Sequence, residues 1–96
     1  MKFEKIIFIR HALTRMFQQY ISIELVEKIA AEGEVIKSYA DDKPFPSYLC
    51  LGFNNIIPVH VVAAFDESEK KCIIVTACIP DSLIWSADFK TKIINK

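Results

Sequence analysis

The sequence has little glycine and no excess of charge of either sign. Only Gly33 and Gly52 occur among 96 residues, so there is no glycine-rich loop of the kind that cradles phosphate groups. Twelve basic and twelve acidic side chains give a formal net charge of zero at pH 7. Nucleic-acid-binding domains usually carry an excess of lysine and arginine, so this balance removes the simplest argument for such a function.

Paired cysteines and long apolar runs are also absent from the sequence. Cys50, Cys72 and Cys78 form an odd set without Cys-x-x-Cys spacing, which predicts reduced core thiols and gives no zinc pattern. The apolar patch at residues 6–9 is interrupted at Arg10 before it reaches the length of a signal peptide, and no run approaches a membrane span. We therefore expect a cytoplasmic protein with no membrane partner, no metal and no other cofactor.

What is present is the composition of an ordinary globular protein, with 52% hydrophobic and 25% charged residues. Because a second core would leave each half too small to be stable alone, we predict a single domain over residues 1–96. Basic residues gather at the two ends of the chain. Residues 1–22 hold four basic side chains and one acidic side chain, and residues 70–96 hold five basic and two acidic side chains. A fold that joins the ends would create a basic surface, and scattered solubilising charge is the alternative.

The segment at residues 58–67 is the most continuous apolar stretch between turn residues and predicts a central strand buried on both faces. Residues 2–9 are rich in Ile and Phe and predict a short strand or an extended arm. Leu13, Met16, Phe17 and Tyr20 recur at helical spacing and predict one apolar stripe on a first helix. The elements predicted after this arm are helices at 11–19 and 22–33, with Ser22 and Gly33 as caps, and strands at 34–39, 47–53, 59–65 and 71–79.

Helices followed by a meander of strands predict an α+β fold. In this fold an N-terminal helical hairpin packs on one face of a mostly antiparallel sheet of about four strands, and the other face stays partly open. Pro80, Asp81 and Ser82 predict the start of a final helical turn, after which we expect a basic, loose tail.

Two histidines and one arginine are the candidates for catalysis. His11 and Arg15 are four residues apart, so they share one helical face and can grip a phosphate there; a surface histidine beside a solvated arginine is the alternative. His60 is the one polar ring within the predicted central strand. It can act as a general acid or base in ribonuclease-type cleavage, and a half-buried histidine bonded to a backbone carbonyl is the alternative.

The loop that follows the strand at 34–39 supplies candidate substrate contacts. Asp41, Asp42 and Lys43 lie between Tyr39 and two prolines, and Tyr39 can stack on a base. Adjacent aspartates in a loop can hold a metal, but they are typical turn-forming residues, so we predict no metal site.

Several motifs carry a resemblance that covers nearly the whole chain. They are His11-Ala12-x-x-Arg15-Met16, Gly33-Glu34-Val35-Ile36-x-x-Tyr39-x-Asp41-Asp42-x-Pro44-x-Pro46-Ser47, His60-Val61-Val62-x-Ala64-x-Asp66-Glu67 and Thr76-Ala77-x-x-Pro80-Asp81. These motifs resemble small prokaryotic domains of unknown function that begin with a His-Ala-x-x-Arg helix. Such domains are similar to the BrnT, RelE and MqsR groups of endoribonuclease toxins.

The resemblance implies a RelE-like fold and a type II toxin that inhibits translation by cutting mRNA without a metal. The implied partners are RNA and a cognate antitoxin, for which a small zinc-finger protein is the candidate; DNA binding by the chain itself is not implied. Gln19 stands where relatives usually have arginine, and Cys78 where they commonly have an aromatic residue. These two departures favour the alternative function, a non-catalytic protein-binding module or an inactive toxin homologue.

Overall fold

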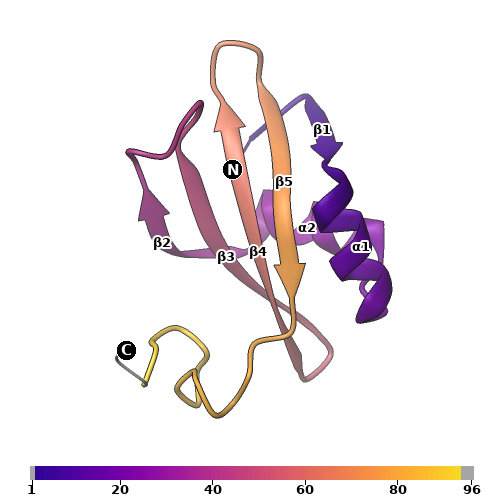
Figure 1. Ribbon diagram of the computed structural model, residues 1–96, viewed down its shortest axis with the longest axis vertical. Helices are drawn as coiled ribbons and strands as arrows, with labels where there is room; N and C mark the ends of the chain where they lie inside the picture. Colours follow the sequence, from indigo (N-terminus) through magenta and orange to yellow (C-terminus); the bar gives the residue numbers. More distant parts are fainter. Residues whose placement is uncertain (1, 94–96) are drawn as a thin grey trace.

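The protein, represented by a computed structural model that describes residues 2–93, consists of one five-stranded sheet and two helices (Figure 1). The elements in chain order are β1 (Lys5–Phe8), α1 (Arg10–Gln18), α2 (Ile23–Glu32), β2 (Glu34–Tyr39), β3 (Ser47–Asn54), β4 (Ile57–Asp66) and β5 (Lys71–Cys78). The predicted helices and the four strands after them are present with bounds within two residues of the predicted ones, and β1 covers residues 5–8 of the segment predicted at 2–9.

The sheet is mixed, with the strand order β1-β5-β4-β3-β2. β2 to β5 form an antiparallel meander, whereas β1 pairs in parallel with β5 at the edge, from Lys5 opposite Lys71 to Phe8 opposite Ile74. The prediction of about four mostly antiparallel strands behind an N-terminal helical hairpin is wrong, because the first element is a strand of the sheet. A parallel pair needs a long connection, and here all the elements between β1 and β5 supply it.

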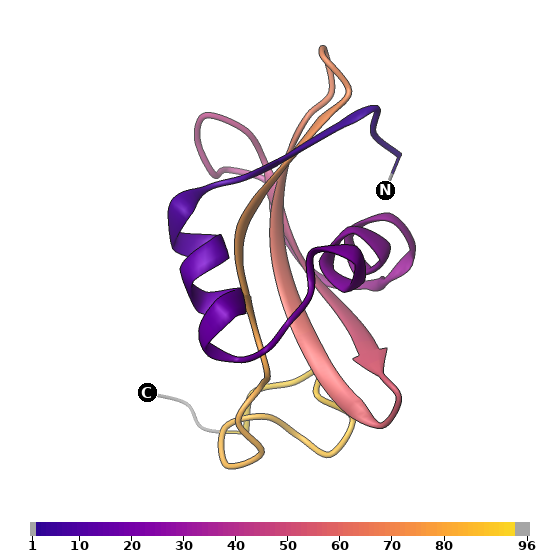
Figure 2. The ribbon, with the colours of Figure 1, turned by 90° about the vertical axis from the view of Figure 1, so that its right-hand side faces the viewer.

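The two helices contact different parts of the sheet instead of packing together as a hairpin on one face. α1 lies along β5, and α2 packs against β3 and β4 (Figure 2). In α1 only Ala12 and Met16 are buried, so the predicted apolar stripe faces the core at Met16 alone. The small Ala12 side chain lets the helix approach β5 closely, which turns the larger apolar residues of the stripe toward solvent.

α2 follows its prediction closely. The Ser22 hydroxyl accepts a hydrogen bond from the Leu25 amide at 3.1 Å and so caps the helix start. Val26, Ile29 and Ala30 are buried, and their helical spacing places them on the side of α2 that faces the core. They belong to one hydrophobic core cluster that also contains residues of α1, β3, β4 and β5.

β4 is the middle strand of the sheet, as the continuous apolar segment predicted. Val59, Val61 and Ala63 are fully buried in the core beneath the helices. The tight turn to β3 contains Asn55 with a φ of 59°, a backbone conformation that asparagine tolerates well. His60 and Val62 point to the opposite face, because side chains alternate along a strand.

Residues 80–93, which we call the strap, fold back over the sheet end that β5 leaves. The Asp81 carbonyl accepts hydrogen bonds from the amides of Ile84 and Trp85, both at 2.9 Å, which closes the turn predicted after Pro80. Trp85 and Lys92 then form an antiparallel bridge. The predicted loose tail is thus ordered as far as Ile93, and residues 94–96 lie outside the described residues. Neither helix within residues 2–93 has the length or apolar character needed to cross a membrane.

Candidate functional site

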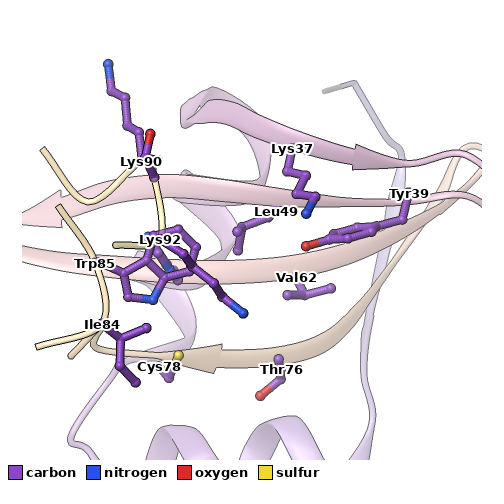
Figure 3. Close-up of a pocket in the computed structure, with 12 residues that line it drawn as sticks. Lys37, Tyr39, Leu49, Val62, Thr76, Cys78, Ile84, Trp85, Lys90 and Lys92 are labelled. Atoms are coloured by element: carbon purple, nitrogen blue, oxygen red, sulfur yellow. The ribbon is translucent and has the colours of Figure 1, made fainter. Parts of the chain in front are cut away.

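A cavity of about 610 Å³ lies between the strap and the sheet face turned away from α2 (Figure 3). The four strands from β2 to β5 supply seven lining residues: Lys37, Tyr39, Leu49, His60, Val62, Thr76 and Cys78. The strap supplies five more: Ile84, Trp85, Lys90, Thr91 and Lys92. The strap therefore forms one wall of the cavity.

Strand register explains why these sheet residues share one surface. Leu49 lies opposite Lys37 on one side and opposite Val62 on the other, and Val62 lies opposite Thr76. Residues that face each other across neighbouring strands project from the same side of the sheet. A row of four side chains from four strands thus forms the floor of the cavity.

His60 fastens the strap to the sheet. Its Nε2 donates a hydrogen bond to the Phe89 carbonyl at 2.8 Å, and its ring meets the Trp85 ring edge-on, with centroids 4.5 Å apart. The His60 side chain is only 3% exposed. Burial lowers the pKa of His60 below its ordinary value, and the bond to the Phe89 carbonyl opposes that shift. The ring is therefore neutral at pH 7, with its remaining lone pair on Nδ1.

Two pairs, each made of a lysine and an aromatic ring, lie on opposite sides of the cavity. Lys37 Nζ lies 5.4 Å from the centre of the Tyr39 ring, and Lys92 Nζ lies 5.9 Å from that of Trp85. Figure 3 shows Lys92 and Trp85 on the strap side, and Lys37 and Tyr39 on the opposite side, with the Tyr39 hydroxyl directed inward. Lys90 forms an ion pair with Glu34 at 3.0 Å, whereas Lys37 and Lys92 form no ion pair with any residue that the structure describes.

Cys78 lines the cavity where α1 approaches β5. Burial raises the pKa of the Cys78 thiol, and the positive charge of Arg15 opposes that shift. The thiol therefore stays protonated at neutral pH and is a poor nucleophile. Gln19 Oε1 accepts a hydrogen bond from the Ile79 amide at 2.8 Å, so Gln19 ties the end of α1 to the residue after Cys78.

The structure brings two of the seven predicted site residues into this cavity, His60 and Tyr39. His11 and Arg15 are exposed on α1 and do not line it. The loop residues Asp41, Asp42 and Lys43 are exposed between β2 and β3, where Asp42 accepts a hydrogen bond from the Ser47 hydroxyl. The catalytic and substrate-binding roles of all seven stay predictions.

Lys37, Trp85 and Lys92 also line the cavity, although they are not among the site residues predicted from the sequence. The sequence does allow Lys37 to be predicted as a neighbour of Tyr39. The two residues are two positions apart on a predicted strand, so their side chains lie on the same face. No comparable signal exists for Trp85 or Lys92, whose positions depend on how the strap folds back.

Within residues 2–93 no three His, Cys, Asp or Glu side chains gather in a group that could hold a metal ion. A family model described as a domain of unknown function, DUF4258, matches residues 8–79 of the chain. The matched region runs from the end of β1 to the residue after β5 and so leaves the strap outside it. The chain has no significant match among curated proteins or solved structures.

Proposed function

The chain belongs to the DUF4258 family of domains of unknown function, and for this member of the family we propose the function of an endoribonuclease. It binds single-stranded RNA in the cavity beneath the strap and cuts it without a metal ion. One observation carries this proposal: two lysine amines, which form no ion pair within residues 2–93, and two aromatic rings lie on opposite sides of a single cavity.

Single-stranded RNA matches such a cavity in both charge and shape. Its phosphates attract the Lys37 and Lys92 amines, and its unpaired bases stack on aromatic side chains such as Tyr39 and Trp85. Double-stranded RNA does not offer free base faces. The single strand is therefore the form of RNA that uses both features of the cavity.

Cleavage needs charge stabilisation and two proton transfers. The ribose 2′-hydroxyl passes its proton to a water molecule and attacks the adjacent phosphorus, the bond from phosphorus to the 5′-oxygen breaks, and that oxygen takes up a proton. Lys37 and Lys92 are placed to stabilise the extra negative charge on the phosphate. The Tyr39 hydroxyl, which points into the cavity, is the candidate proton donor. Nε2 of His60 is engaged with the Phe89 carbonyl, which leaves only Nδ1 for proton exchange. The role of His60 is therefore to hold the strap.

The biological role that we propose is that of a type II toxin, active in the cytoplasm on mRNA and neutralised by a cognate antitoxin. This part rests on the resemblance of the His11-to-Arg15 and His60-to-Glu67 motifs to the BrnT, RelE and MqsR toxin groups. The antitoxin candidate is a small zinc-finger protein.

Binding and cleavage can be measured on one labelled single-stranded RNA of about 12 nucleotides, a length that spans a typical single-strand site. We expect the natural chain to bind and cut it, and induced expression to arrest bacterial growth. Lys92→Ala and Lys37→Ala should each weaken binding about tenfold, since each removes a charged phosphate contact. Tyr39→Phe should keep binding but slow cleavage. Lys28→Ala, which changes an exposed lysine on α2, is the matched control and should change neither.

The second candidate function is a module that binds RNA without cutting it. The hydrogen bond of His60 to the strap favours this candidate, because it occupies one ring nitrogen of the histidine. It predicts the same loss of RNA binding in Lys37→Ala and Lys92→Ala, but intact RNA and normal growth with the natural chain. Failure of the natural chain to bind RNA would overturn both functions for this cavity.

A further inference from the structure

The outward side of α1 carries large apolar side chains that the fold leaves in solvent. They are Ile9, Leu13, Phe17 and Tyr20, which we call the α1 surface. Phe17 is 85% exposed and Tyr20 is 95% exposed. Because α1 contacts the core mainly through Ala12 and Met16, Phe17 and Tyr20 contribute little to folding. An apolar group of this kind on a surface indicates a site of interaction.

The α1 surface has the shape of a ridge. Ile9, Leu13 and Phe17 follow one another at intervals of four residues and so stack along one side of the helix. Tyr20 extends the ridge past the helix end, where its φ of 58° stops the helix. A row of this spacing packs against the side-chain rows of a second helix, because ridges of one helix fit the grooves of another.

The charged side chains of α1 itself are all basic. α1 contains Arg10, His11 and Arg15 and no acidic residue. Arg10 comes three residues before Leu13 and therefore borders the ridge. In the part of the chain that the structure describes, no ion pair involves a residue of α1. The Arg10 guanidinium can therefore pair with a carboxylate of an incoming partner.

We propose that the α1 surface docks an acidic amphipathic helix of another protein. A second copy of this chain fits poorly, because two α1 helices packed together would oppose arginine to arginine. RNA fits poorly as well, because the aliphatic Ile9 and Leu13 offer no face for base stacking. The proposal concerns a surface separate from the cavity and holds whether or not the cavity binds RNA.

The probe for this surface is a labelled synthetic helical peptide of about 18 residues, or five turns, with leucines on one face and glutamates beside them. A matched peptide replaces each glutamate by lysine. We expect the full chain to bind the glutamate peptide saturably in fluorescence anisotropy, about tenfold more tightly than the lysine peptide.

Three variants show whether binding uses the α1 surface. Phe17→Ser should weaken binding of the glutamate peptide at least tenfold, because it removes the centre of the ridge. Arg10→Glu should weaken the glutamate peptide and strengthen the lysine peptide. Ile56→Ser removes an equally exposed apolar side chain, in the turn between β3 and β4, and should leave both affinities unchanged.

Other outcomes would overturn the proposal. Equal affinity for the two peptides, no binding of the glutamate peptide, or binding that Phe17→Ser leaves intact would each exclude an acidic helix as the partner of this surface. Binding to vesicles of equal parts phosphatidylcholine and phosphatidylglycerol, lost in Phe17→Ser, together with no peptide binding, would assign the surface to a membrane. A dimer in light scattering that Phe17→Ser dissociates would assign it to a second copy.

Discussion

His60 shows how one side chain can determine the shape of a cavity. It projects from the middle strand and reaches the strap through a hydrogen bond to the Phe89 carbonyl and an edge-on contact with Trp85. Phe89 adopts a φ of 62°, a left-handed conformation that non-glycine residues rarely adopt. The His60 bond helps to hold the Phe89 carbonyl in that position, which keeps the aromatic and basic residues of the strap above the sheet.

His60→Ala should therefore loosen the strap and make stability less dependent on pH. Loss of one hydrogen bond and one ring contact should lower the free energy of unfolding by about 2 kcal/mol in urea titrations. Because burial depresses the pKa of His60 below 6.5, the unfolded chain binds a proton more readily than the folded chain. The contribution of His60 to stability is then complete above pH 6.5 and is lost as the pH falls below it. His60→Ala should lose that part of the pH dependence.

Trp85 is the only tryptophan, so its fluorescence reports on the strap directly. The emission of His60→Ala should shift to the red at pH 7, as the indole enters water, and far-ultraviolet circular dichroism should stay unchanged. His11→Ala, on the exposed side of α1, is the control and should change stability by less than about 0.5 kcal/mol. An unshifted Trp85 emission in His60→Ala would show that His60 does not hold the strap.

At the scale of elements, the close approach of α2 to β3 determines where the helix ends. Gly33 has an extended backbone conformation, so its role is to provide space and not to supply a positive φ. A Cβ atom at this position would lie 2.5 Å from the Ile29 carbonyl oxygen and 2.9 Å from the Leu51 carbonyl oxygen. Both are backbone atoms, which cannot turn away as a side chain can.

Gly33→Ala should consequently push α2 away from β3 and destabilise the protein. Overpacking of this kind lowers the free energy of unfolding by about 1–3 kcal/mol, measurable in urea. Glu32→Ala, one residue earlier and exposed, is the control and should be close to neutral. A Gly33→Ala protein as stable as the natural chain would mean that helix and strand can separate at little cost.

The strap is the element that connects the fold to the proposed function. The sheet face alone presents a row of mostly apolar and neutral side chains around His60, and the strap adds the Trp85 ring and the Lys92 amine. The DUF4258 match ends at residue 79, before this element begins. The composition of the cavity is therefore decided in part by residues outside the matched region.

At the scale of the whole molecule, the zero net charge is divided unevenly. Residues 23–69 carry nine acidic and three basic side chains, in contrast to the basic ends of the chain. Lys37 is one of the few basic residues of this acidic segment, and it lines the cavity. Lys92 lines the cavity too and belongs to the basic C-terminal segment. RNA binding would therefore depend on a few local contacts and not on a field over the whole surface.

This distribution predicts a weak salt dependence of RNA binding. Two phosphate contacts to a single strand give a slope of roughly −1.4 for the logarithm of the binding constant against the logarithm of salt concentration. Lys37→Ala should reduce the magnitude of that slope by about 0.7, whereas Lys28→Ala, on α2, should not change it. Anisotropy titrations at several salt concentrations measure the slope, and a value several times steeper would indicate a binding surface much larger than the cavity.

Local patterns in the sequence determined most of the elements of this protein. The capping hydroxyl of Ser22, the inward stripe of α2 and the apolar run of β4 each act over a few neighbouring residues, so the sequence alone predicts them. The pairing of β1 with β5, the direction in which α1 faces and the course of the strap depend on contacts between distant segments. Periodicity does not encode such contacts, because they arise from which surfaces fit together once the core has formed. The sequence identified His60 and Tyr39 as candidate site residues from their chemistry. Only the tertiary structure placed Lys37, Trp85 and Lys92 around them, because that arrangement depends on contacts between distant segments.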